Sequence, residues 1–130
     1  LGFIANDYER ALALKKMGWT LSQLLRKTSL VVTTYGAKGS EVRQGRGVVR
    51  VPAAKPRATL DPTGAGDAYR AGFVFGLLQR WPIAVTARFA GVVAAYTVER
   101  MGTQTHRFTG PQLRRRYLSN FGRDVPPPSP

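Results

Sequence analysis

The sequence contains no cysteine and only one histidine, His106, among its 130 residues. The absence of cysteine excludes disulfide bridges, thiolate metal ligands and a cysteine nucleophile. A single histidine argues against metal sites built from several histidines and against a Ser-His-Asp catalytic triad. The chemistry of this chain must therefore be sought in other residue types.

Long uninterrupted hydrophobic runs are also missing. The most apolar stretch, residues 71–98, is interrupted by Gln79-Arg80, Pro82 and Arg88, which leaves pieces too short to span a bilayer. The sequence opens at Leu1 without an initiator Met, a basic segment or a cleavage site, so no targeting signal is visible. We therefore expect a soluble, cytoplasmic protein whose sequence starts in the middle of a longer one.

Acidic residues are scarce, because seven Asp and Glu stand against 20 Lys and Arg, for a net charge of +13. Such an excess is common in proteins that bind nucleic acids or anionic membranes. A nucleic-acid-binding module would show a basic stripe interleaved with aromatic residues, whereas here the longest basic run is Arg114-Arg-Arg116. This run either binds polyanions or forms the solvated face of a helix, and we favour the solvated face.

Hydrophobic residues make up 43% of the chain, enough to build a core, and the length suits one domain or a piece of one. The alternation of apolar and polar residues predicts strands over residues 29–35, 40–44 and 47–51, the last two as a hairpin. Helical periodicity predicts helices over about residues 7–17, 20–27, 65–79, 83–101 and 111–121. This order favours an α/β fold with a largely parallel sheet.

The two long predicted helices are apolar on most faces and need more sheet than three strands provide. This shortage also indicates a piece of a larger domain. The spacing Gly72-x-x-x-Gly76 is found in membrane helices, but here we expect it to allow close packing in a soluble core. Residues 121–130 are rich in proline, which cannot sustain a helix or an inner strand, and we expect a disordered tail there.

The segment Asp61-Pro-Thr-Gly-Ala-Gly-Asp67 stands between an expected strand end and a predicted helix. Its two glycines let the backbone turn sharply and bring N–H groups close to a ligand. At a helix N-terminus, such N–H groups and the helix dipole form an anion site. A carboxylate fits there if it accepts a proton from an attacking hydroxyl while the amides hold the developing charge. Taken as a bare Gly-x-Gly, the segment is more simply a loop in which Asp67 caps the helix.

Two further motifs precede this segment. Asn6-Asp-Tyr-Glu9 and Thr34-Tyr-Gly-Ala-Lys-Gly39 are, taken singly, an ordinary helix cap and an ordinary turn. In this order with Asp61-Pro-Thr-Gly-Ala-Gly-Asp67-Ala-Tyr, they resemble the signatures of the ribokinase/PfkB family of sugar and nucleoside kinases. The resemblance covers residues 1–120, as the C-terminal part of a kinase domain. It implies the C-terminal portion of a three-layer, Rossmann-like α/β sandwich, followed by the tail.

The resemblance implies a role for each residue of the third motif. Asp67 matches the catalytic base, which takes the proton from the acceptor hydroxyl. The backbone at Gly64, Ala65 and Gly66 matches the anion hole for the transferred phosphoryl group. Arg70, one turn further along the helix, either contacts a phosphate or pairs with a carboxylate.

The same resemblance implies a nucleotide site and a metal site. Thr34, Gly36 and Gly39 match a turn that lies along the phosphates of ATP. Asn6 and Glu9 match a motif that helps to hold Mg²⁺ and phosphate, largely through water.

A monovalent-cation site is also implied. Asp61 and Thr63 match positions near the loop that binds K⁺ in potassium-dependent members of the family. The implied reaction is transfer of the γ-phosphate of ATP to a hydroxyl of a small molecule. The resemblance further admits a homodimer of the complete protein, because family dimers use a lid outside this sequence.

The acceptor is less defined than the reaction. Pro62 and the segment Tyr96-Thr-Val-Glu-Arg-Met-Gly-Thr-Gln-Thr-His106 resemble the prokaryotic adenosine or nucleoside kinase branch, with a sugar as the alternative acceptor. His106 either approaches an adenine or is a solvated residue, and we favour the second. The rival interpretations are a basic nucleic-acid- or anion-binding module and a family-like chain without catalysis. For the 130 residues alone we expect no activity.

Overall fold

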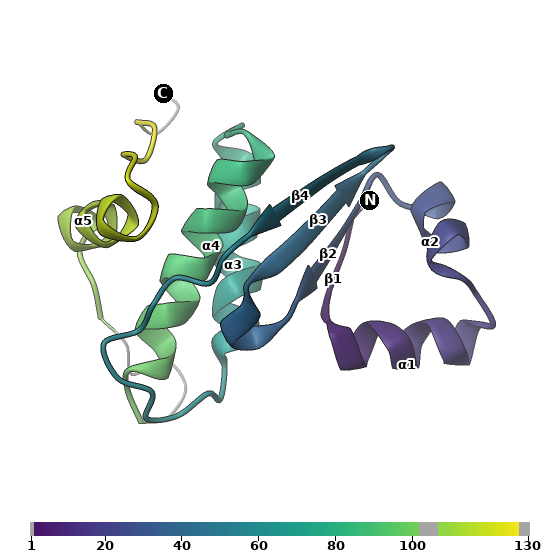
Figure 1. The fold of residues 1–130 in the computed structure, drawn as a ribbon, viewed down its shortest axis with the longest axis horizontal. Coiled ribbons are helices and arrows are strands. Elements are labelled where there is room, and N and C mark those ends of the chain that lie inside the picture. Colours follow the sequence, from purple (N-terminus) through teal and green to yellow (C-terminus); the bar gives the residue numbers. More distant parts are fainter. Residues whose placement is uncertain (1, 102–106, 128–130) are drawn as a thin grey trace. The chain divides into compact units, whose positions relative to one another are not determined.

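A computed structural model describes residues 2–101 and 107–127, which form two compact units, residues 1–52 and 53–130 (Figure 1). Unit 1 contains β1 (Gly2–Asn6), α1 (Asp7–Met17), α2 (Leu21–Lys27), β2 (Leu30–Thr34), a single 3-10 turn η1 (Gly36–Lys38), β3 (Ser40–Gln44) and β4 (Gly47–Val51). Unit 2 contains α3 (Ala65–Leu78), α4 (Ile83–Val98) and α5 (Gly110–Phe121). Each unit is described by itself.

The four strands of unit 1 form one sheet in the order β1-β2-β3-β4. β1 and β2 are parallel, whereas β2 with β3 and β3 with β4 are antiparallel. The prediction of a largely parallel sheet is therefore wrong for the described residues. Residues 35–39 and Gly45-Arg46 are the only links between the last three strands, and links this short cannot make a parallel crossover.

Strand β1 is not among the predicted strands. Its sequence starts with glycine and has a single buried residue, Ala5, so local signals for a strand are weak. Pairing with β2 in the register Gly2↔Leu30 to Asn6↔Thr34 makes it a strand. β2 itself is a run of β-branched residues with Val31, Val32 and Thr33 fully buried, as its sequence predicts.

In unit 2, α3 and α4 pack against each other at very short distance (Figure 1). A Cβ atom on Gly72 would lie 2.9 Å from the Cα of Ala90, and one on Gly76 would lie 2.8 Å from a methyl carbon of Thr86. The expectation that these glycines serve close helix packing is confirmed. Among the described residues, no helix is long and apolar enough to cross a membrane.

The disordered tail expected over residues 121–130 stays a prediction, and the described part of this segment makes contacts within unit 2. Val125 is buried in the same hydrophobic cluster as residues of α3, α4 and α5. Asp124 forms an ion pair with Arg114 at 2.5 Å, and the Trp81 indole donates a hydrogen bond to the carbonyl of Pro127 at 3.4 Å. Proline prevents helix and inner-strand pairing here, but it does not prevent an extended segment from packing through an apolar side chain.

Candidate functional site

Two of the three motifs lie side by side in unit 1. Asn6 ends β1 and Thr34 ends β2, and these two residues are paired in the register of the parallel strands. Ligands of α/β proteins bind beyond the carboxyl ends of parallel strands. The fold therefore brings the first two motifs to the sheet edge at which a ligand is expected.

The side chains of the first motif cap a helix. The Glu9 N–H donates to Asn6 Oδ1 at 2.7 Å, and the Asn6 N–H donates to Glu9 Oε2 at 3.1 Å. These reciprocal bonds form a capping box at the start of α1. One oxygen of each side chain is thus engaged in capping the helix, which is the usual role of such a four-residue motif.

The second motif forms a tight turn whose backbone conformation favours glycine at two positions. Gly36 has φ 57°, and Gly39 has φ 94° with ψ −144°, conformations that side chains disfavour. The Tyr35 N–H closes the turn by donating to the carbonyl of Gly39 at 2.8 Å. Thr34 enters this turn from the end of β2.

A pocket of about 310 Å³ lies next to this turn, bordered by Tyr35, Lys38 and Glu41 among others. Glu41 is 6% exposed and forms ion pairs with Arg43 at 2.6 Å and Arg50 at 2.9 Å. Burial by itself raises the pKa of Glu41, but the hydrogen bonds and charges of the two arginines outweigh it, so the pKa lies below its ordinary value. This pocket was not predicted from the sequence, although Glu41 and Arg43 lie two apart in a strand and so share one face.

The third motif begins in irregular chain, because the described residues between the end of β4 at Val51 and the start of α3 form no strand. The N–H groups of Leu60 and Asp61 donate to the carbonyl of Val98 at 2.8 and 3.3 Å, which ties the segment to the end of α4. Asp61 Oδ1 then accepts the N–H of Thr63 at 2.9 Å. The expected strand end is thus replaced by a turn held by Asp61.

Gly64 starts α3 in a left-handed conformation, φ 81° and ψ −4°, without any side-chain cap. The Ala65 N–H turns back and donates to the carbonyl of Pro62 at 3.2 Å. Gly66 and Asp67 occupy the next two positions of the first turn, where N–H groups have no partner within a helix. The Ala65 N–H, which was one of the expected anion donors, is therefore directed into the loop.

Asp67 is exposed, with 82% of its side chain accessible. Arg70 Nη1 donates to Asp67 Oδ1 at 2.8 Å, so of the two roles considered for Arg70 the structure has the carboxylate pair. The ion pair fixes one oxygen of the carboxylate at the start of α3, where the helix dipole favours negative charge.

The structure thus places Asn6, Glu9, Thr34, Gly36 and Gly39 in unit 1, and Asp61, Thr63, Gly64, Ala65, Gly66 and Asp67 in unit 2. His106 and the four residues before it lie outside the described residues. Within the described part of the chain, no three His, Cys, Asp or Glu residues gather as a metal cluster.

The profile of the pfkB family carbohydrate kinases matches residues 3–108, a range that includes all three motifs. The chain belongs to this family. A nucleoside kinase from Methanothermobacter thermautotrophicus is 39% identical over 97 residues, which cover 75% of this chain and 31% of that protein. A ribokinase from Lactococcus lactis is 32% identical over 85 residues, covering 65% of this chain and 28% of that protein. The chain therefore spans about a third of the length of these pfkB relatives.

Solved structures of the pfkB family agree with the fold. The nucleoside kinase of Burkholderia thailandensis in complex with inosine superposes with a TM-score of 0.92 at 29% identity, over 95% of this chain and 41% of that one. The nucleoside kinase of Methanocaldococcus jannaschii gives a TM-score of 0.85 at 26% identity, over 91% of this chain and 40% of that one. The expected partial ribokinase-like α/β fold is confirmed.

Proposed function

We propose that the complete protein to which this chain belongs transfers the γ-phosphoryl group of ATP to a hydroxyl of a nucleoside. Family membership supports the reaction class. Nucleoside kinases among the relatives support the acceptor, as does the Burkholderia thailandensis enzyme, which is solved with inosine and with ADP-inosine. The observation that carries the proposal is the exposed carboxylate of Asp67 on the uncapped first turn of α3.

In this proposal Asp67 acts as the general base. It accepts the proton of the acceptor hydroxyl as that oxygen forms a bond to the γ-phosphorus, and the bond from phosphorus to ADP breaks. Phosphoryl transfer depends mainly on positioning and on stabilising charge at the equatorial oxygens. The N–H groups of Gly66 and Asp67 would serve that charge, with Gly64 and Ala65 shaping the loop around it.

The turn of unit 1 would serve the nucleotide. Thr34, Gly36 and Gly39 would lie along the phosphates of ATP. Mg²⁺, when bound, supplies neutralisation of phosphate charge. Asn6 and Glu9 fit this ion, because Mg²⁺ prefers oxygen ligands and commonly keeps water and one or two carboxylates in proteins.

Asp61 and Thr63 would adjoin a K⁺ site. Both provide oxygen atoms, and the bond from the Thr63 N–H to Asp61 Oδ1 holds them in one turn. We extend the proposal to a cytoplasmic location, where ATP is available, and to a homodimer, which rests on the family resemblance alone. The 130 residues by themselves would be inactive, since they span 41% or less of the relatives compared above.

The test is a coupled assay of ADP release by the complete protein, with inosine, adenosine and ribose as acceptors. We expect turnover with at least one nucleoside and its loss in Asp67→Asn. Turnover with ribose alone would correct the acceptor and leave the reaction class. Undiminished turnover in Asp67→Asn would reject Asp67 as the base.

A further inference from the structure

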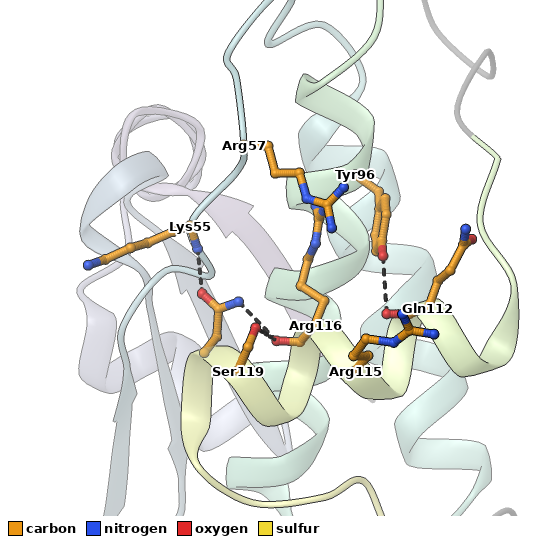
Figure 2. Close-up of a pocket in the computed structure, with 8 residues that line it drawn as sticks. Lys55, Arg57, Tyr96, Gln112, Arg115, Arg116 and Ser119 are labelled. Carbon is orange, nitrogen blue, oxygen red and sulfur yellow. Dashed lines mark hydrogen bonds between the residues drawn. The ribbon is translucent and has the colours of Figure 1, made fainter.

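A basic pocket in unit 2 shares no residue with the three motifs. Its volume is about 620 Å³, a size that small-molecule sites commonly have. Lys55 and Arg57 border it from the segment before α3, Tyr96 from α4, and five residues of α5 between Gln112 and Asn120 complete the lining (Figure 2). Every residue of this lining carries a polar or charged group, and four of the eight are Lys or Arg.

One wall of the pocket is fixed by Arg116. Its side chain is 6% exposed and pairs with Glu99 Oε1 at 2.5 Å. Its guanidinium lies over the ring of Tyr96, 3.8 Å from the ring centre. The Tyr96 hydroxyl in turn donates to the carbonyl of Gln112 at 3.1 Å. Charge, stacking and hydrogen bonding therefore hold this wall in one arrangement.

The other three positively charged side chains of the pocket have no such ion pair with any described residue. Among residues 2–101 and 107–127, the side chains of Lys55, Arg57 and Arg115 have no carboxylate partner. Arg57 reaches Glu99 only through its backbone N–H, which donates to Oε1 at 2.7 Å. The one carboxylate at this pocket is thus shared by the Arg57 backbone and the Arg116 side chain.

The side chain of Arg57 extends toward the guanidinium of Arg116, whereas that of Lys55 extends away from both (Figure 2). Like charges that converge on one pocket repel each other unless an anion lies between them. Guanidinium groups match the oxygens of phosphate with paired hydrogen bonds.

The geometry points to a binding site for a small phosphate-bearing anion in this pocket. Arg57 and Arg115 supply the direct contacts, and the Arg116–Glu99 pair holds the wall beside them. The volume exceeds that of a phosphate group, so an organic group attached to the phosphate also fits. The basic run at Arg114–Arg116, for which a solvated face was expected, is thus divided between an ion pair with Asp124 and this pocket.

Isothermal titration calorimetry of the 130-residue chain with pyrophosphate, and separately with AMP, tests the proposal. We expect saturable binding to one site, weakened about tenfold or more by Arg57→Gln and by Arg115→Gln, because each removes a charge-assisted contact. Both side chains are exposed, so the variants keep the fold, which circular dichroism checks. The matched control, Arg123→Gln, removes one exposed positive charge outside the pocket and leaves affinity within about twofold.

The two ligands distinguish the source of the phosphate. Tighter binding of AMP supports a phosphate ester as the ligand, and tighter binding of pyrophosphate supports a free inorganic anion. Absence of saturable binding, or binding that neither pocket variant alters, overturns the proposal. So does equal weakening by all three variants, which indicates general charge attraction. Binding of a short single-stranded DNA but of neither small anion, with steep salt dependence, also overturns it.

Discussion

The helices of the first and third motifs, α1 and α3, begin in opposite ways. At α1, Asn6 and Glu9 close a capping box that satisfies backbone N–H groups from within the chain. At α3, the cap position is Gly64, which has no side chain to offer. The first terminus is completed by the protein itself, and the second is left with N–H groups that an anion can satisfy.

The difference is not a general property of the helices in this chain. α2 and α5 also begin with capping boxes, formed by Thr20 with Gln23 and by Thr109 with Gln112. α4 has Pro82 at its cap position and no side-chain cap, but it carries no acidic residue in its first turn. Only α3 among these five combines an uncapped start with a first-turn carboxylate, Asp67.

The largest expected effect comes from removing the carboxylate at the open terminus. Asp67→Asn should lower turnover of the complete protein by about 10²- to 10⁴-fold, the usual contribution of a general base. ADP affinity should stay within about threefold, because the backbone N–H groups remain. Steady-state kinetics and calorimetry measure the two quantities.

The control for that experiment is Asp124→Asn. Asp124 is also an exposed aspartate of unit 2 that pairs with an arginine, Arg114, but it lies outside the motifs. Its replacement should leave turnover unchanged, and a comparable loss would show that the kinetics respond to exposed ion pairs in general.

Replacing the glycine cap should disturb the open terminus itself. Gly64→Ala places a side chain at φ 81° and should lower the free energy of unfolding by about 1 kcal/mol. It should also weaken ADP binding, since the first turn of α3 must shift. Chemical denaturation and calorimetry with ADP measure the two effects.

Gly122→Ala is the matched control, because Gly122 has φ 65° at the end of α5 and no atom near its missing side chain. The two variants should lose similar stability, and only Gly64→Ala should lose affinity for ADP. Equal affinities would mean that the start of α3 does not contact the nucleotide.

Removing the N-cap of α1 tests whether Asn6 has a role besides capping the helix. Asn6→Ala should lower the free energy of unfolding by about 1 kcal/mol, the typical value of an N-cap. If Asn6 also helps to hold Mg²⁺, the metal concentration for half-maximal turnover should rise by about tenfold. Thr20→Ala removes an equivalent cap from α2 and should cost similar stability without changing the Mg²⁺ requirement. Identical Mg²⁺ curves for the two variants would restrict Asn6 to folding.

The smallest expected effect comes from replacing Glu41, whose carboxylate is buried, whereas that of Asp67 is exposed. The pKa of Glu41 is lowered in the folded state, so its stabilising contribution is present above the ordinary carboxyl pKa and is lost as the pH falls through the folded value. Glu41→Gln should lower the free energy of unfolding by about 0.5–1 kcal/mol at pH 7, because its arginine partners are partly exposed. The difference from the wild-type chain should shrink toward pH 3 in urea titrations, and a constant difference would exclude the ion pairs as its cause.

Local rules predicted most elements of the fold, because their signals lie in adjacent residues. Gly45-Arg46 fixed the hairpin, and the β-branched run at 30–34 fixed the central strand. Strand β1 and the antiparallel pairing were not predictable in this way, since they depend on contacts between segments distant in sequence. The packing of Val125 depends on the same kind of contact.

The candidate site divides in a similar manner. The order of the three motifs located Asp67 at the start of a helix, which the structure also shows. Sequence did not reveal that the Ala65 N–H turns into the loop, because the conformation of Gly64 decides this. The basic pocket was equally hidden, since it unites Arg57, Tyr96 and Arg115 from three separate segments.

The close contact of α3 with α4 has a consequence for motion. With Gly72 against Ala90 and Gly76 against Thr86, α3 cannot slide or rotate along α4 without steric overlap. The packing of α3 against α4 therefore also holds the first turn of α3 in place. In the proposed reaction, any adjustment to an arriving phosphate would take place in the loop at residues 61–64, while the N–H groups of Gly66 and Asp67 would keep their direction.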